Sequence, residues 1–229
     1  MFKKLIIAAL SASFVVSTAF ADSTNIGVRI SMADLNASGS ETTDQATTVT
    51  QNNQSSDFAL PSIFVERQID LSSYMNTDAS VSFGLDFVPL TARLKSVSGE
   101  NGGQGVDADI KVGNLMTAYI QPTFSVNEDV SVFAKVGYAQ GDLDVSNVTR
   151  TTNTDGETAP TDTAAGLTLE GPVFGIGAQL NKDGGVFNFI RIEASRTDFD
   201  AVSFVTSNAK TLTADAEVDS ITITIGKSF

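Results

Sequence analysis

Apolar and polar residues alternate with a period of two along most of this chain. Between Ile221 and Ile225 isoleucine takes every second position, and threonine takes the positions between. The same alternation runs through residues 26–32 and 130–138, whereas no stretch shows the repeat of an amphipathic helix. Strict alternation indicates β-strands with two different faces. The pattern therefore predicts an all-β protein.

The segments with this alternation are separated by connections that differ in length. Eight strands are expected, at residues 24–35, 57–70, 78–94, 107–125, 129–146, 164–181, 186–200 and 215–229. The seven connections alternate long, short, long, short, long, short, long, and both termini lie on the side of the short ones. Sorting of this kind is typical of an antiparallel up-and-down barrel that crosses a membrane, with short turns at one end and long external loops at the other.

The composition of the polar faces separates a membrane barrel from a soluble one. In several segments the polar face carries glycine, serine and threonine rather than rows of lysine and glutamate. Small residues fit the narrow interior of an eight-stranded barrel, and an apolar outer face fits lipid. We therefore expect Phe83, Val132 and Ile223 to face lipid. A soluble, exported, ligand-binding β-barrel has the same alternation and is the alternative.

The first residues differ from the rest of the chain. Lys3 and Lys4 precede an apolar stretch, and small residues lead up to Ala21. This order predicts a secretory signal peptide, residues 1–21, cleaved after Ala21. The remainder, residues 22–229, is expected to form a single barrel domain.

The chain is acidic, with 14 basic and 27 acidic residues. Removing Lys3 and Lys4 leaves 12 basic residues against 27 acidic ones, a net charge of −15. This balance excludes a nucleic-acid-binding footprint, which is basic. The acidic residues in or beside the long connections are Glu41, Asp44, Asp57, Glu100, Asp107, Asp109, Asp142, Asp144, Asp155, Glu157, Asp162, Asp198, Asp200 and Asp215. They could bind Ca²⁺ or Mg²⁺ that bridges lipopolysaccharide phosphates, or they could be solvated loop residues; no spacing matches a dedicated metal site.

Catalytic chemistry has little support in the sequence. The chain contains no histidine and no cysteine, so the usual general base and the usual thiol nucleophile are both missing. A pair of carboxylates is the remaining option, and no spacing favours one. We expect a protein that is not an enzyme and holds no cofactor.

Six charged residues occupy positions on the inward faces of the expected strands. They are Arg29, Glu66, Asp86, Lys135, Arg191 and Glu193. Because an unpaired charge inside a barrel is costly, the three cations and three carboxylates are expected to pair across strands. The network could be a structural plug that fixes strand register, or a gate on a narrow conduction path.

Aromatic residues are expected to form belts at the two membrane interfaces. Phe124 and Phe229 fall towards the short-turn end, and Tyr138 and Phe199 fall towards the long-loop end.

Together the leader, the eight alternating strands and the final Phe229 resemble the outer-membrane β-barrel proteins of Gram-negative bacteria. The resemblance is to the small eight-stranded group that includes the OmpA transmembrane domain and the opacity-type porin family, and it covers residues 22–229. The stretch FAKVGYAQGD, residues 133–142, is similar to the glycine-aromatic strands of that group.

The resemblance implies an assembly signal in the last strand. In that family the barrel-assembly machinery reads a terminal aromatic preceded by alternating apolar residues. Ile221, Ile223, Ile225 and Phe229 match this signal, whereas Lys227 departs from it.

The resemblance also implies a location and a role. The location is the bacterial outer membrane, with lipid and lipopolysaccharide as surroundings and periplasmic chaperones as partners during biogenesis. The role is structural and surface-interacting: membrane integrity, with external acidic loops for adhesion or for cation and lipopolysaccharide contact. A narrow, low-conductance pore for small solutes is the second reading.

Overall fold

The computed structural model describes residues 23–42, 48–72, 78–94, 99–101, 104–151, 162–182, 184–205 and 211–229. The expected signal peptide, residues 1–21, lies outside these residues. No helix in the part of the chain that is described has the length and apolarity to cross a lipid bilayer.

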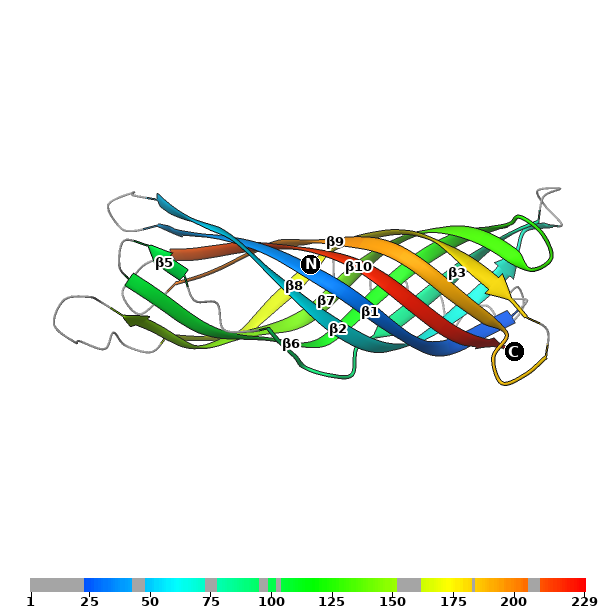
Figure 1. Ribbon diagram of the computed structural model, residues 1–229, viewed down its shortest axis with the longest axis horizontal. Coiled ribbons are helices and arrows are strands. Elements are labelled where there is room, and N and C mark those ends of the chain that lie inside the picture. Colours follow the sequence, from blue (N-terminus) through cyan, green and yellow to red (C-terminus); the bar gives the residue numbers. More distant parts are fainter. Residues whose placement is uncertain are drawn as a thin grey trace.

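The described residues form one closed antiparallel β-barrel, shown in Figure 1. Its strands are β1 (Ser23–Thr42), β2 (Thr48–Asp70), β3 (Ala79–Phe87), β4 (Ala92–Leu94), β5 (Gly99–Asn101), β6 (Gln104–Ser125), β7 (Val130–Thr151), β8 (Asp162–Asn181), β9 (Phe189–Val205) and β10 (Thr211–Ser228). β3, β4 and β5 all pair with β6 and share one position in the ring. The ring of described strands therefore has eight positions, which confirms the expected fold.

The barrel closes between its first and last strands. β1 and β10 pair from Asn25 opposite Ser228 to Thr42 opposite Thr211 without a register shift. Beyond that ladder, the Phe229 N–H donates to the Thr24 carbonyl at 2.9 Å, and the Thr24 N–H donates to the Phe229 carbonyl at 3.0 Å. Closure leaves no open sheet edge, as a barrel surrounded by lipid requires.

Two short turns have recognisable turn chemistry. The Asn127 side-chain oxygen accepts hydrogen bonds from the main-chain N–H groups of Asp129 and Val130, at 2.9 and 2.8 Å, which closes the β6–β7 turn as an Asx-type turn does. At the end of β2 the main-chain N–H and the hydroxyl of Ser72 donate to Asp70, and these hydrogen bonds lower the pKa of the Asp70 carboxyl. Local hydrogen bonding thus defines this end of the barrel.

Several strands extend further towards the long-loop end than the sequence predicts. The expected strand 24–35 continues to Thr42, and the expected strand 57–70 already begins at Thr48. Serine, threonine, asparagine and aspartate in these stretches favoured loops in the sequence reading. Cross-strand pairing nevertheless continues through them, to Thr42 opposite Thr211 on one side of β1 and to Thr42 opposite Thr48 on the other.

The region 78–106 differs from its prediction in two ways. The expected strand 78–94 is interrupted between Phe87 and Ala92, where Pro89 has no N–H to donate to a ladder. The Val88 N–H instead donates to the Leu115 carbonyl at 2.9 Å. The expected connection 95–106 contains β5, which pairs with the start of β6.

Near the short turns the barrel is apolar on the outside. Ile176 is 68% exposed and Ile223 is 49% exposed, and Val132 and Val136 also point outward. A soluble barrel has the opposite arrangement, so this band identifies a transmembrane barrel. We call this part, level with Ile26–Met32 on β1, the membrane half.

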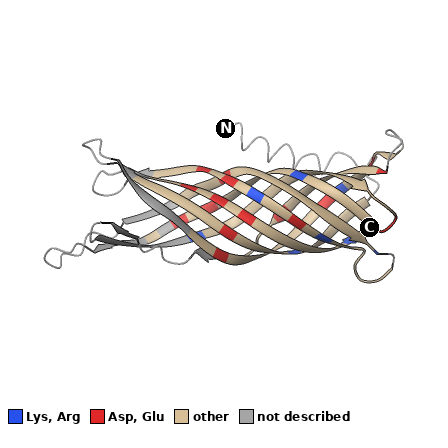
Figure 2. Cartoon of the chain, turned by 45° about the horizontal axis from the view of Figure 1, so that its top comes forward, with Lys and Arg blue, Asp and Glu red and all other residues tan. Residues whose placement is uncertain are grey.

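Beyond Met32 the polarity of both faces reverses, and we call this part the loop half. Along β1 the outward positions change from Ile30 and Met32 to the exposed Asp34. The inward positions change from Arg29 to Ala33 and Leu35, which line the interior. Figure 2 shows acidic residues (red) on the strands themselves, around the middle of the barrel.

Phe199 illustrates the reversal and corrects one expectation. The sequence reading placed it in an outer aromatic belt, but its side chain lines the interior of the loop half. The reason is parity: on β9, Phe199 shares its face with Arg191 and Glu193, which are buried inside the barrel. Phe124 and Phe229, by contrast, are exposed on the outside near the short turns.

Candidate functional site

Inside the membrane half, four aromatic rings each lie against a glycine on a neighbouring strand. The pairs are Phe64 with Gly27, Tyr119 with Gly84, Phe133 with Gly177, and Phe189 with Gly226. A Cβ atom at any of these glycines would overlap the ring opposite. The glycines therefore create the space in which large inward side chains fit a narrow barrel.

Glu66 and Arg191 form the first ion pair of the interior. The Arg191 Nη1 and Nη2 atoms donate to the two carboxylate oxygens of Glu66 at 2.9 and 2.5 Å. Glu66 also accepts hydrogen bonds from Asn25 and from the Tyr119 hydroxyl, both at 2.9 Å. Glu66 is 0% exposed and Arg191 is 2% exposed. A bidentate guanidinium–carboxylate pair with further donors satisfies the buried carboxylate.

Two further ion pairs lie beside the first. The Arg29 Nη1 atom donates to Asp86 at 2.5 Å, and its Nη2 atom donates to the Tyr119 hydroxyl at 2.8 Å. Lys135 pairs with Glu193. Because the Tyr119 hydroxyl accepts from Arg29 and donates to Glu66, it joins the first two pairs into one network.

Aromatic rings hold the cations in place. The Arg29 guanidinium lies 4.4 Å from the Phe64 ring centroid, and the Lys135 Nζ atom lies 4.7 Å from the Tyr119 centroid. The Arg191 guanidinium lies 4.4 Å from the Phe189 centroid. Such cation–π contacts strengthen when water is excluded. We call the six charged residues and Tyr119 the plug.

The structure brings together all six charged residues that the sequence places inside, and each cation has a carboxylate partner. Sequence reasoning missed Tyr119 and Asn25, which complete the network together with Gln179; the Gln179 side-chain oxygen accepts from the Arg191 Nε atom at 2.5 Å. Parity was the signal available for Tyr119. It alternates with the outward Ile120 just as the other inward residues alternate with apolar neighbours.

The second candidate site is a row of carboxylates on the outside of the loop half. Asp34 on β1 lies directly opposite Asp57 on β2 and directly opposite Asp219 on β10. Arg196 donates two hydrogen bonds to Asp219, at 2.8 and 2.9 Å. Within the described residues Asp34 and Asp57 have no basic partner. Like charges directly opposite one another repel, so this carboxylate row favours a cation.

The structure corrects one expectation about the other acidic residues. The sequence reading placed Glu41, Glu100 and Asp162 in the long connections, whereas they lie on β1, β5 and β8. Asp44, Asp155 and Glu157 fall outside the described residues. In the described part of the chain no three acidic side chains lie close enough to hold a metal ion by themselves.

The residues of the expected assembly signal lie on the outer surface. Ile221 and Ile223 are exposed on the lipid-facing side of β10, and Phe229 is 73% exposed. The Lys227 Nζ atom donates to the Gly185 carbonyl in the β8–β9 turn at 3.0 Å. The lysine that departs from the family pattern is thus placed at the short-turn end of the barrel.

Comparison with solved structures finds outer-membrane barrels. The outer-membrane protease OmpT of Escherichia coli matches with a TM-score of 0.50 and 7% identity over 93% of this chain and 99% of that chain. The attachment invasion locus protein Ail of Yersinia pestis, in complex with the heparin analogue sucrose octasulfate, gives 0.42 and 14% over 90% and 99%. Neisserial surface protein A gives 0.39 and 10% over 89% and 99%.

These likenesses concern architecture. At 7% identity OmpT shows the fold alone, and the present chain has no histidine for a histidine-based mechanism. No protein-family model matches the chain, and no curated protein matches it in sequence. The barrel and its polarity therefore establish the fold and its outer-membrane setting.

Proposed function

We propose that this protein is a structural and surface-interacting component of the outer membrane. Its plug closes the barrel, and its outer wall contacts lipopolysaccharide through divalent cations. The observation that carries the proposal is the carboxylate row of Asp57, Asp34 and Asp219, which lies on three neighbouring strands immediately beyond the apolar band.

The level of the carboxylate row explains why a cation would bind there. Lipid phosphates lie just outside the hydrocarbon region, and the end of the apolar band on β1, where Met32 is followed by Asp34, supports placing them at this level. Carboxylates and phosphates repel one another, and Ca²⁺ or Mg²⁺ between them offsets both charges with the oxygen ligands these ions prefer. A site completed by lipid phosphates agrees with the lack of a protein-only metal cage among the described residues.

The plug supports a structural role over conduction. The Glu66–Arg191 pair is bidentate, and the Tyr119 hydroxyl bonds to both this pair and the Arg29–Asp86 pair. The side chains of Glu66, Arg191 and Lys135 are buried. Moving one charge would leave its partner unpaired inside the barrel, which is costly. We expect no current steps in planar-bilayer recordings at high salt; regular single-channel steps would instead support the narrow-pore reading.

A chelation experiment tests the cation contact. The Asp34→Asn/Asp57→Asn variant and a control with the same charge change at the short-turn end, Asp78→Asn/Asp129→Asn, are reconstituted in vesicles containing lipopolysaccharide. EDTA should lower the thermal unfolding midpoint of the wild type and the control, and should leave that of the carboxylate-row variant almost unchanged. Equal losses in all three proteins would refute the contact. In phosphatidylcholine vesicles that contain Mg²⁺ but no lipopolysaccharide, EDTA should leave the thermal unfolding midpoint of all three proteins unchanged.

Biogenesis is the remaining part of the proposal. Residues 1–21 would direct export, and Ile221, Ile223, Ile225 and Phe229 would be read by the barrel-assembly machinery after periplasmic chaperones deliver the chain. Phe229→Ala should slow the appearance of the folded, heat-modifiable form in cells, whereas Ser228→Ala should not. Equal rates for the two variants would remove Phe229 from the signal.

A further inference from the structure

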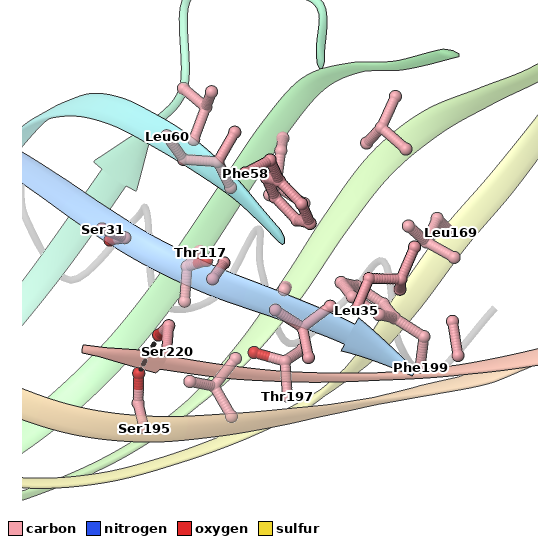
Figure 3. A pocket seen from close by; sticks show the side chains of 18 of the residues that line it. Ser31, Leu35, Phe58, Leu60, Thr117, Leu169, Ser195, Thr197, Phe199 and Ser220 are labelled. Atoms are coloured by element: carbon pink, nitrogen blue, oxygen red, sulfur yellow. Dashed lines mark hydrogen bonds between the residues drawn. The ribbon is translucent and has the colours of Figure 1, made fainter. Parts of the chain in front are cut away.

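The interior of the loop half contains a cavity of about 240 Å³ that the roles proposed above do not use. Leu35, Phe58, Leu60, Leu169, Val173 and Phe199 contribute to its wall, and inward residues of all the long strands surround it. Figure 3 shows several of these side chains converging on the space between the strands. Protein interiors seldom contain voids much larger than a water molecule, so this space is more than a packing defect.

The cavity has an apolar wall and a polar floor. Its floor is the surface of the plug that faces the loop half, and it is formed by Arg29, Asp86, Lys135 and Glu193. Just above them, the Ser195 and Ser220 hydroxyls share a hydrogen bond of 2.9 Å, visible in Figure 3. The end near the membrane half is therefore suited to a polar head group, and the rest of the cavity to an apolar group.

The dimensions of the cavity favour a single unbranched chain. Its lining runs along β1 from Arg29 to Ala37, and eight residue steps on a strand tilted by about 40° give a length of roughly 20 Å along the barrel axis. An eight-stranded barrel is only wide enough for its own side chains. At ~30 Å³ for each water molecule, the volume of about 240 Å³ corresponds to about eight water molecules. Because a methylene group is about that size, a chain of on the order of ten carbons fits.

Charge at the floor selects the type of head group. The two cations there are already paired, Arg29 with Asp86 and Lys135 with Glu193. A charged head group would arrive without a free counter-charge, and burying it would be costly. A hydroxyl can instead join the serine hydroxyls as both donor and acceptor.

We infer that the loop half binds a neutral single-chain amphiphile, such as a fatty alcohol, with its hydroxyl on the plug and its chain along the apolar wall. The inference is independent of the cation contact, because the ligand lies inside the barrel and the carboxylate row lies outside.

Methyl NMR in nanodiscs of chain-deuterated phosphatidylcholine tests the site with protonated 1-dodecanol. Wild-type protein should show cross-peaks from the dodecanol chain to the methyl groups of Leu35, Leu60 and Leu169. Dodecanol dissolved in the lipid would give cross-peaks to the outward Ile223 only, and that result would overturn the inference.

Two matched variants and a second probe sharpen the test. Ala139→Phe fills the cavity from β7 and should weaken dodecanol binding roughly tenfold or more. Ala134→Phe adds the same ring on the outer face of β7 and should leave the inward cross-peaks unchanged; their survival in Ala139→Phe would contradict the site. Heat-modifiable gel migration verifies that both variants fold.

The second probe is dodecanoate, which carries a charged head group. It should bind at least about tenfold more weakly than dodecanol, and equal affinity would refute the neutral head group.

Discussion

The membrane half and the loop half of the barrel carry opposite polarities on the same strands. On β1 and β2 of the membrane half, Ile30 and Ile63 face outward while Arg29 and Glu66 are buried inside. In the loop half Asp34 and Asp57 face outward, while Leu35 and Phe58 line the interior. Alternation sends successive side chains to opposite faces, so polarity can reverse along a strand while its hydrogen-bond register continues.

The two interiors also differ in how specifically they are built. Polar groups in the membrane half need partners at a defined angle, and Tyr119 and the ion pairs supply most of those in the plug. The buried Arg29 Nε atom is left without a partner among the described residues. Apolar contacts in the loop half have no direction, and the interior there leaves a cavity. Single substitutions should therefore be far more damaging in the membrane half than at equivalent places in the loop half.

The largest contrast is expected at the plug. Glu66→Gln leaves the buried Arg191 without a counter-charge and should lower the free energy of unfolding by roughly 3–5 kcal/mol. Asp198→Asn, on the exposed outer wall of the loop half, should stay within about 0.5 kcal/mol. Urea unfolding in lipid vesicles, followed by circular dichroism, measures both. Glu66→Gln/Arg191→Gln should recover part of the loss, and an unchanged midpoint for Glu66→Gln would dismiss the pairing.

The next contrast concerns the outer surface. Ile223→Lys places a charge in the middle of the apolar band and should cost about 2–4 kcal/mol. Thr168→Lys makes a similar change on the exposed outer face of the loop half and should cost less than about 0.5 kcal/mol. If the two variants unfold at the same urea concentration, the boundary between the halves is misplaced.

Glycine positions give a smaller contrast. Gly84→Ala forces a Cβ atom into the Tyr119 ring, which two hydrogen bonds hold in place, and should cost about 1–3 kcal/mol. Gly39→Ala in the loop half meets its nearest neighbour at 3.5 Å and should have almost no effect. Thermal melts compare them directly, and equal midpoints would show that the ring moves freely.

The smallest effect is expected for an arginine on the same strand as Arg191. Arg196 pairs with Asp219 and Glu217 on the outer wall, where its side chain is half exposed. Exposed ion pairs contribute little and are screened by salt. Arg196→Gln should shift the unfolding midpoint slightly at low salt and not at all in 1 M NaCl. A large shift of the unfolding midpoint that does not depend on salt would show that this pair behaves like the buried ion pairs of the plug.

Much of the membrane half could be predicted from the sequence. Alternation assigns each residue to a face once one inward residue is known, and that sufficed to place Arg29, Lys135 and Glu193 inside. The choice of partners could not be predicted in the same way. Glu66 and Arg191 are separated by 125 residues, and their meeting depends on the tilt and stagger of the closed barrel.

The loop half was harder to predict. Its outward residues have loop-like composition, so the sequence reading ended strands too early at Leu35 and began them too late at Asp57. Phe58, Leu60 and Phe199 lie inside the expected strands, but their inward position was overlooked because the apolar face was assumed to point outward throughout.

The Glu66–Arg191 pair links the second strand of the barrel to its penultimate strand, and this has a consequence for assembly. Before β9 joins the barrel, Arg191 cannot pair with Glu66. An incomplete barrel therefore holds the Glu66 carboxylate in its interior without this counter-charge. Ring closure and charge neutralisation thereby become a single step that disfavours any stalled, incomplete cylinder. Pulse-labelling during refolding should show β1–β10 amides and the interior of β2 becoming protected in the same kinetic phase, and protection of β2 well before β10 would exclude this coupling.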